Sequence, residues 1–161
     1  MPNIAYLSLG SNLGDRERNL REAIERIGQI GALLSVSSIY ETEPVEVTEQ
    51  PEFLNCALQL ETSLMPAPLM QRLLAVEKAM GRQRVQKKGP RIIDIDILLF
   101  GSSVVNTAGL TIPHPAMHNR RFVLQPLAEI VPEVEHPLLK KTVQELLAEL
   151  PAGQAVRKIK S

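Results

Sequence analysis

The sequence predicts an α+β fold built on one antiparallel sheet, and three observations support this prediction. Between residues 3 and 100, segments with strand and helix periodicity follow one another in the order β-α-β-β-α-β. This order matches the ferredoxin-like split βαβ arrangement, whose right-handed crossovers put both helices on one face of the sheet. The remaining residues carry helical patterns and form a C-terminal helical extension. With 161 residues, the chain has the length of a single domain spanning 1–161.

A polar turn separates the first strand from the first helix. Residues 3–9 read as a strand that ends at Gly10-Ser11-Asn12, residue types that tolerate unusual backbone angles. Asp15 can cap the following helix, whose apolar stripe continues until a glycine-flanked break at 28–31. Alternating residues then predict one second strand over 33–42.

The second half of the core repeats this order after a loop at 43–52. That loop has neither helical nor strand periodicity and is long enough to be functional. Strict alternation predicts a strand at 53–62, and early prolines begin a helix over 66–80. A strand rich in Ile and Leu covers 92–100 and completes a sheet whose second face we expect to be open to ligands.

The C-terminal extension is read from caps and breaks. Residues 101–109 form a short turn or hairpin, and Asn119 is expected to cap a helix that ends at Pro132. A last helix is predicted at about 142–150, and the final ten residues form a peripheral strand or a tail.

Composition limits the kinds of partner. Lys plus Arg and Asp plus Glu number 18 each, so the net charge is zero and neither nucleic acid nor an anionic membrane is an expected partner. Cys56 is the single cysteine, which excludes an intramolecular disulfide and favours a cytoplasmic location. The chain has no run of 18 apolar residues that would predict a membrane span.

Two acids interrupt the apolar strand at 92–100. Asp94 and Asp96 are two residues apart, so their carboxylates share one face of the strand, roughly 6.6 Å apart along its axis. A hard divalent cation such as Mg²⁺ would neutralise them. Five basic and no acidic residues stand between Arg82 and Arg91, which suggests a polyphosphate beside the metal. A DxD pattern alone also occurs in structural strands.

Further ionisable side chains precede and follow this strand in the sequence. Residues 110–126 contain two histidines and two arginines, a combination that suits phosphoryl transfer. Glu77 lies near the C-terminal end of its helix, where the dipole disfavours an acid, so it is either a surface acid or a site residue.

Five motifs together resemble the 6-hydroxymethyl-7,8-dihydropterin pyrophosphokinase family. They are GSNLGDR, YETEP, PEFLN, KKGPRIIDIDILLFG and LTIPHPAMHNRRFVLQPL, and they cover about residues 3–132 in order. The resemblance implies a ferredoxin-like fold and transfer of a pyrophosphoryl group from ATP to the pterin hydroxymethyl oxygen, with release of AMP. It also implies action in folate biosynthesis on two small-molecule substrates. We expect the chain to be a monomer, although the sequence leaves its oligomeric state open.

The resemblance assigns the phosphate half of the site. Two Mg²⁺ ions would be held by Asp94 and Asp96, and the catalytic set would consist of Arg82, Arg91, Asp94 and Asp96. Positions that match ATP-binding residues of the family are Glu77, Arg84, Arg91, His114 and Arg120. Their competing interpretation is as surface cations and loop caps, and His118 is taken as structural.

The resemblance also assigns the pterin half. Phe53 and Phe122 would stack on the flat ring while Asn55 reads its amide-like edge. Backbone groups of Thr42 and Val45 would complete the recognition. For the two phenylalanines, core packing is the alternative.

Departures from the family pattern concern loop and adenine contacts. Lys88 and Pro115 stand where relatives often have Trp and Tyr, and the segment 82–91 is one residue shorter than in some relatives. Two other functions compete: a nucleotidyltransferase, and a non-catalytic binding module in which the two acids hold a structural cation. Release of AMP from ATP and the pterin alcohol would distinguish the pyrophosphokinase from both.

Overall fold

A computed structural model describes residues 2–42, 52–81, 91–153 and 155–160. Its centre is a sheet in the order β5-β1-β4-β3-β8, with β2 also paired to β4. Every pairing in this sheet is antiparallel. The strands are β1 (Asn3–Ser11), β2 (Ala32–Val36), β3 (Ile39–Thr42), β4 (Phe53–Thr62), β5 (Asp94–Phe100) and β8 (Val156–Lys160). The predicted α+β, ferredoxin-like core is therefore confirmed.

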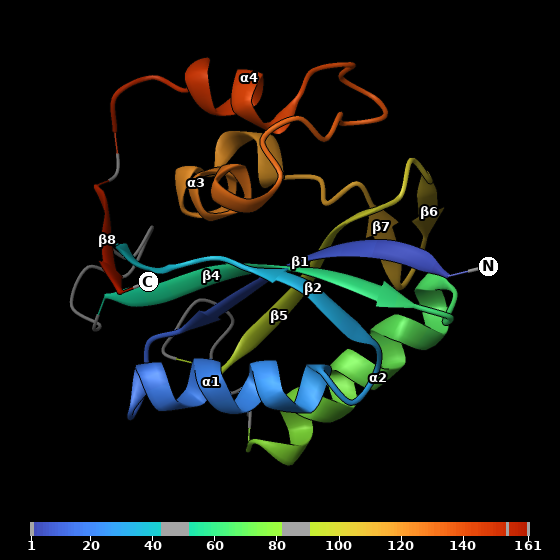
Figure 1. Ribbon diagram of the computed structural model, residues 1–161, viewed down its shortest axis with the longest axis vertical. Helices are drawn as coiled ribbons and strands as arrows, with labels where there is room; N and C mark the ends of the chain where they lie inside the picture. Colours follow the sequence, from blue (N-terminus) through green and yellow to red (C-terminus); the bar gives the residue numbers. More distant parts are fainter. Residues whose placement is uncertain (1, 43–51, 82–90, 154, 161) are drawn as a thin grey trace.

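Two helices cover one face of the sheet, as the right-handed crossovers predict. They are α1 (Arg16–Ile27) and α2 (Pro66–Ala79), drawn below the sheet in Figure 1. Their apolar stripes pack with alternate residues of the central strands in one cluster that includes Leu7, Leu58 and Ile95. The Asp15 side chain accepts from the backbone N of Arg18 and caps α1, as expected.

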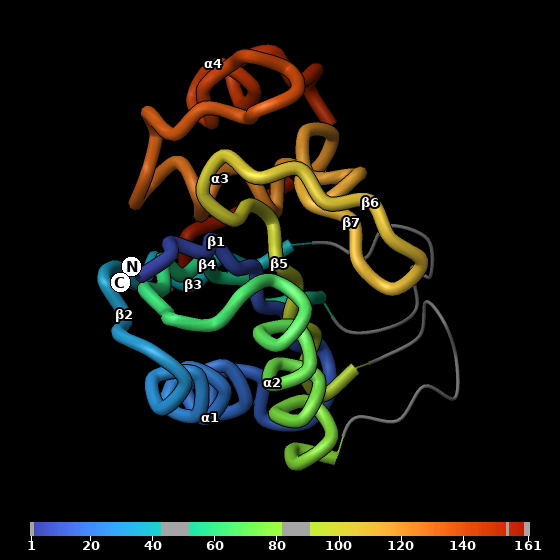
Figure 2. The backbone as a smooth tube through the Cα atoms, turned by 90° about the vertical axis from the view of Figure 1, so that its right-hand side faces the viewer, coloured from blue at the N-terminus to red at the C-terminus, as the bar shows by residue number. Residues whose placement is uncertain are grey.

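The opposite face is not open along its whole length, contrary to the prediction. It is covered in part by α3 (Arg121–Ile130), on which α4 (Val143–Ala148) packs as an outer layer (Figures 1 and 2). This layer buries a second apolar cluster, which includes Leu99, Leu124 and Leu127. Beside it stands the hairpin of β6 (Val105–Thr107) and β7 (Leu110–Ile112), followed by a 3-10 helix (Met117–Asn119).

The single strand predicted at 33–42 is wrong: it is divided into β2 and β3 at Ser37 and Ser38. Ser37 and Ala57 exchange two hydrogen bonds. The backbone N of Ala57 donates to Oγ of Ser37, and the backbone N of Ser37 donates to the carbonyl of Ala57. Ser38 donates its N and Oγ to the Glu129 carboxylate of α3. Polar side chains therefore replace regular strand pairing at this step, which alternation alone could not reveal.

Glu129 also anchors the covering layer to the sheet. Besides Ser38, Tyr40 of β3 donates its hydroxyl to Glu129 at 2.6 Å. Burial raises the pKa of Tyr40, and the hydrogen bond and charge of Glu129 raise it further. Burial acts to raise the pKa of Glu129, but donation from Tyr40 and Ser38 outweighs it and lowers the pKa. Helix α3 is thus held to β3 by a charge-assisted cluster.

Several boundaries differ from the sequence predictions. Strand β1 continues through Gly10 to Ser11 instead of ending at residue 9, and α3 ends at Ile130 rather than at Pro132. Strand β5 begins at Asp94 rather than Ile92, and Arg120, not Asn119, is the N-cap residue of α3. The last helix is shorter, from Val143 to Ala148, and begins with a capping box of Thr142 and Glu145. The C-terminal residues form strand β8, one of the two predicted possibilities.

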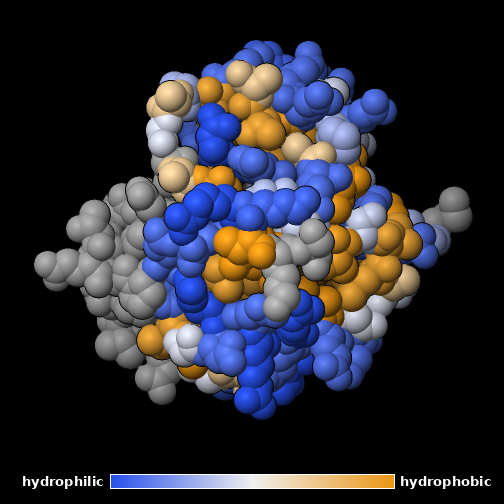
Figure 3. All heavy atoms as spheres, turned by 60° about the vertical axis from the view of Figure 1, so that its left-hand side comes forward, coloured by the Kyte–Doolittle hydropathy of each residue, from blue (hydrophilic) through white to orange (hydrophobic). Residues whose placement is uncertain are grey.

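The described surface carries scattered apolar side chains. Exposed examples are Leu34 and Val36 on β2 and Ile159 on β8. Figure 3, in which the left-hand side of Figure 1 comes forward, shows apolar patches bordered by hydrophilic residues. None of the described helices has the length and apolar character needed to cross a membrane.

Candidate active site

Strand register brings the predicted acids and the predicted amide into adjacent positions. Gly10 of β1 pairs with Asn55 of β4 on one side and with Asp94 of β5 on the other. One row along, Ser8 pairs with Asp96. Directly opposed residues in antiparallel strands share a face, so Asn55, Asp94 and Asp96 project to the same side, as expected.

The β3–β4 end of this face contains two buried polar atoms that have no hydrogen-bond partner among the described residues. They are Oγ1 of Thr42 and Oδ1 of Asn55, and both residues are buried. A buried acceptor without a donor is unfavourable in a folded protein and often marks a place for a ligand. Both residues were predicted as pterin contacts from the sequence.

Gly10 lets the Asn55 amide lie directly on the strand. A Cβ at residue 10 would stand 2.9 Å from Nδ2 of Asn55 and 3.5 Å from Cδ1 of Phe53. The first separation is shorter than van der Waals contact, so any side chain there would displace the amide. Gly10 is thus a site residue that the sequence prediction treated only as a turn former.

The two predicted stacking rings come from different layers. Phe53 begins β4 beside Gly10 and pairs with Thr42, whereas Phe122 lies in the first turn of α3; both rings are half-buried. The guanidinium of Arg120 lies 5.6 Å from the centre of the Phe122 ring, within cation–π range. Phe122 also packs against the second apolar cluster, which supports the core-packing alternative, and its stacking on the pterin stays a prediction.

Arg91 is fixed at the entry to β5. Its guanidinium contacts both oxygens of Asp94, at 3.2 and 3.0 Å. Its backbone N donates to Oδ1 of Asn12 at 2.6 Å, and its carbonyl accepts from the Asn12 N at 2.9 Å. These bonds explain why regular pairing of β5 starts only at Asp94. Asn12, another member of the GSN turn, was also not predicted as a site residue.

Asp96 and His114 line one cleft of about 300 Å³ between β5, α2 and the β6–β7 hairpin. Burial lowers the pKa of His114, the charge of Asp96 acts to raise it, and that of Arg120 lowers it. The Nδ1 atom of His114 accepts from the backbone N of Ala116, so the neutral ring carries its proton on Nε2. His114 can therefore donate a hydrogen bond into this cleft.

Glu77 lies on the α2 side of the sheet and is buried. Its Oε2 atom accepts from the backbone N of Ile95 at 2.7 Å, between the two acids of β5. This bond satisfies a backbone group at the edge of the sheet. The surface-acid interpretation is therefore wrong, and the predicted contact with ATP stays a prediction.

The two acids of β5 fit a magnesium site by their chemistry. Both side chains are half-buried on one face and offer the hard oxygen ligands that Mg²⁺ prefers. Among the described residues, no three or more His, Cys, Asp or Glu side chains form a metal-binding group. Two carboxylates suffice for a cation that takes its other oxygens from water and phosphate.

Three predicted residues, Arg82, Arg84 and Val45, lie outside the described residues. Of the other predicted positions, the structure gathers Thr42, Phe53 and Asn55 at one end of the sheet face. It gathers Arg91, Asp94, Asp96 and His114 at the other end. The missed residues, Gly10 and Asn12, belong to the GSN sequence that was predicted as a turn. Gly10 is instead part of β1, between Asn55 and Asp94, and Asn12 directly follows that strand.

Comparison with known proteins connects this arrangement to an enzyme family. The family model described as 7,8-dihydro-6-hydroxymethylpterin-pyrophosphokinase (HPPK) matches residues 6–132. The 2-amino-4-hydroxy-6-hydroxymethyldihydropteridine pyrophosphokinase of Bacillus subtilis is 49% identical over 137 residues, covering 84% of this chain and 82% of that protein.

Longer proteins contain a similar segment. The Folic acid synthesis protein FOL1 of Dictyostelium discoideum is 40% identical over 157 residues, covering 98% of this chain but only 24% of that protein. A wild-type HPPK-DHPS of Plasmodium falciparum, solved with pteroate, superposes with a TM-score of 0.73 at 16% identity. The match covers 92% of this chain and 44% of the solved one, and it shows similarity of fold.

Proposed function

The chain belongs to the 7,8-dihydro-6-hydroxymethylpterin-pyrophosphokinase family, and from this premise we propose how its residues divide the reaction. It is a pyrophosphokinase of folate biosynthesis. It transfers a pyrophosphoryl group from ATP to the hydroxymethyl group of 6-hydroxymethyl-7,8-dihydropterin. The pterin oxygen attacks the β-phosphorus, the bond from that phosphorus to the bridging α-phosphate oxygen breaks, and AMP leaves with that oxygen.

The pterin binds at the β3–β4 end of the sheet face. The observation that carries this assignment is the pair of buried acceptors without donors, Oγ1 of Thr42 and Oδ1 of Asn55. The edge of the pterin ring carries N–H donors, which would satisfy the Asn55 acceptor. Phe53 and Phe122 stack on the ring, and Val45 completes the pocket through its backbone.

ATP occupies the cleft lined by Asp96 and His114. His114 donates from Nε2 to a phosphate oxygen, and Arg120 adds positive charge beside it. Arg82, Arg84 and Arg91 neutralise the remaining phosphate charge, and Glu77 holds the backbone of β5 between its two acids.

Asp94 and Asp96 would hold two Mg²⁺ ions. When bound, they offset the charge of the ATP phosphates and lower the pKa of the pterin hydroxyl. The ion pair between Asp94 and Arg91, at 3.0 Å, holds that guanidinium beside the two acids, where we assign it to the phosphate charge. We assign no side chain as a dedicated general base.

The remaining assignments concern the whole chain. Residues 1–161 form one catalytic domain that acts as a monomer in the cytoplasm on its two small-molecule substrates, without nucleic acid or membrane as partner. The near-neutral charge balance and the single cysteine support these assignments.

The test is a coupled assay of AMP release with Mg²⁺, ATP and 6-hydroxymethyl-7,8-dihydropterin. Wild type is expected to release AMP, and Asn55→Ala should raise the KM for the pterin about a hundredfold with little change in the KM for ATP. Wild type that releases no AMP would refute the function. An equal rise in both KM values would refute the division of the two pockets.

A further inference from the structure

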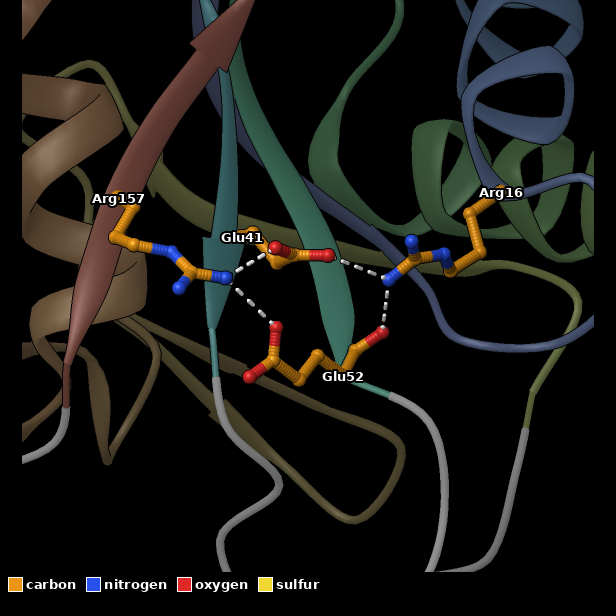
Figure 4. Close-up of polar contacts among 4 residues, drawn as sticks. All are labelled: Arg16, Glu41, Glu52 and Arg157. Atoms are coloured by element: carbon orange, nitrogen blue, oxygen red, sulfur yellow. Dashed lines mark hydrogen bonds and ion pairs between the residues drawn. The ribbon is translucent and has the colours of Figure 1, made fainter.

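Two arginines from distant parts of the chain bridge the same pair of glutamates (Figure 4). Arg16, at the start of α1, donates to Oε2 of Glu41 at 3.1 Å and to the carbonyl of Glu52 at 2.7 Å. Arg157 of β8 donates to Oε1 of Glu41 and to Oε2 of Glu52 at 3.1 Å. The four residues form a closed ring with two positive and two negative charges, which we name the arginine clamp.

The arginine clamp differs from the ordinary surface ion pairs of this protein. Arg21–Glu17 and Arg26–Glu22 each join residues four positions apart on the exposed surface of α1. In the clamp, the Glu41 side chain is only 18% exposed and receives a guanidinium on each oxygen. Burial acts to raise the pKa of Glu41, but hydrogen bonds from Arg157 and Arg16 outweigh it and lower the pKa. A partly buried network holds its geometry better than isolated exposed pairs do.

The clamp lies directly beneath the pterin end of the site. Glu41 immediately precedes Thr42, Glu52 immediately precedes Phe53, and Thr42 pairs with Phe53 at the end of the β3–β4 ladder. Since side chains alternate along a strand, Glu41 points to the α1 side while Thr42 points to the site face. The arginines therefore act from the reverse side of the sheet, on the backbone that carries Thr42 and Phe53.

The C-terminal strand supplies one of the two arginines of the clamp. In the β3–β8 register, Glu41 pairs with Arg157 and Thr42 pairs with Val156. Without β8, the four-residue strand β3 would be an edge of the sheet, paired only with β4. Arg157 lies beyond residues 6–132, which match the family model, so the clamp adds a contribution from outside that segment.

We infer that Arg16 and Arg157 are positioning residues for the pterin: they fix the spacing of the β3 and β4 ends at which Thr42 and Phe53 meet the ring. This inference rests on the proposed pterin site. It makes strand β8 part of the substrate-binding apparatus although neither arginine touches the substrate. Small displacements of groups that position a substrate reduce affinity and rate even when the reacting groups are intact.

The experiment compares two double variants with the same change of charge. Arg16→Gln/Arg157→Gln removes both clamp guanidiniums, whereas Arg21→Gln/Arg26→Gln removes two guanidiniums from exposed pairs of α1. The KM for the pterin should rise about tenfold in the clamp variant, and the KM for ATP should stay within about twofold. The control variant should match wild type in both. Calorimetric titration with the pterin alone should show the same loss of affinity.

Further variants separate positioning from general stability. Arg157→Lys keeps one donor and the charge, so its KM for the pterin should lie between those of wild type and Arg157→Gln. In a Glu41→Gln background, Arg157→Gln should raise the KM for the pterin by a smaller factor than in wild type, because the partner of Arg157 is already weakened. Since the Arg157 side chain is 63% exposed, Arg157→Gln alone tests the inference should the double variant not fold.

Either of two results would overturn the inference. One is an unchanged KM for the pterin in the clamp variant; the other is an equal rise of the KM values for pterin and ATP, which would indicate general destabilisation. Both results are distinct from failure of the proposed function, which would appear as absence of AMP release by wild type.

Discussion

The two faces of the central sheet are built from the same strands but serve different purposes. On the α1/α2 side, alternate residues form one apolar cluster, in which burial raises the pKa of the Cys56 thiol to about 12 and keeps it neutral. On the α3 side, apolar packing is confined to part of the face. The rest of that face contains Asn55, Asp94 and Asp96. Neighbouring residues of one strand thus differ in what they contribute, stability on one side and chemistry on the other.

The site face itself has two contrasting ends. At the β5 end, Asp94 already has the guanidinium of Arg91 as a partner. At the β3–β4 end, the acceptors of Thr42 and Asn55 have none. Leaving a charged group without a partner in a partly buried site is strongly unfavourable in free energy. Leaving a neutral acceptor without a donor until the ligand binds is less unfavourable.

The largest effect is expected from adjacent residues of β5 that point to opposite faces. Asp96→Ala should reduce kcat/KM about a thousandfold or more, with little change in unfolding free energy. Ile95→Ala should destabilise the fold by about 3 kcal/mol through a cavity, while the KM values of the folded enzyme stay near wild type. AMP release and urea unfolding measure the two quantities. If both variants lose activity and stability to similar extents, the division between faces is wrong.

A smaller effect is expected where the two ends of the site meet at Gly10. In Gly10→Ala the new Cβ would displace the Asn55 amide, so the KM for the pterin should rise about tenfold and that for ATP should not. The matched control is Gly153→Ala, because a Cβ there meets only a carbonyl at 3.9 Å. Steady-state kinetics with each substrate varied in turn would show the split. A Gly10→Ala enzyme with wild-type pterin kinetics would mean that Asn55 tolerates the displacement.

The smallest effect concerns pH and the layer that covers the site face. All three histidines lie in residues 114–136, and buried His136 accepts the backbone N–H groups of Leu138 and Leu139 through Nδ1. Burial lowers the pKa of His136, and neighbouring His118 lowers it further. The folded state therefore keeps this ring neutral while the unfolded chain takes up a proton below about pH 6.5.

Stability should consequently fall as the pH is lowered through the unfolded-state pKa of His136. Urea unfolding at a series of pH values between about 7.5 and 5 would measure how steeply the unfolding free energy falls with pH. His136→Gln should make this dependence less steep. An identical slope in the variant would assign the pH dependence to other groups.

Much of the fold followed from local patterns in the sequence. Strict alternation over 53–62 predicted β4 with its bounds, and Asp15 predicted the cap of α1. Local patterns were wrong where distant partners intervened. The strand at 33–42 is divided because Ser38 binds Glu129, 91 residues away, and β5 starts late because Asn12 binds Arg91. For Glu77 the sequence left two interpretations, a surface acid or a site residue, because nothing near it in sequence shows the Ile95 backbone that it binds.

The sequence by itself determined the element order, the two acids on one strand face and the motifs of the family, because periodicity and motif chemistry are local properties. Only the tertiary structure decided which residues meet across strands. Register placed Asn55 and Asp94 on either side of Gly10, the covering layer narrowed the open face, and β8 returned to join Arg157 to Glu41. These contacts depend on pairing and packing between segments far apart in the chain, which no local pattern encodes.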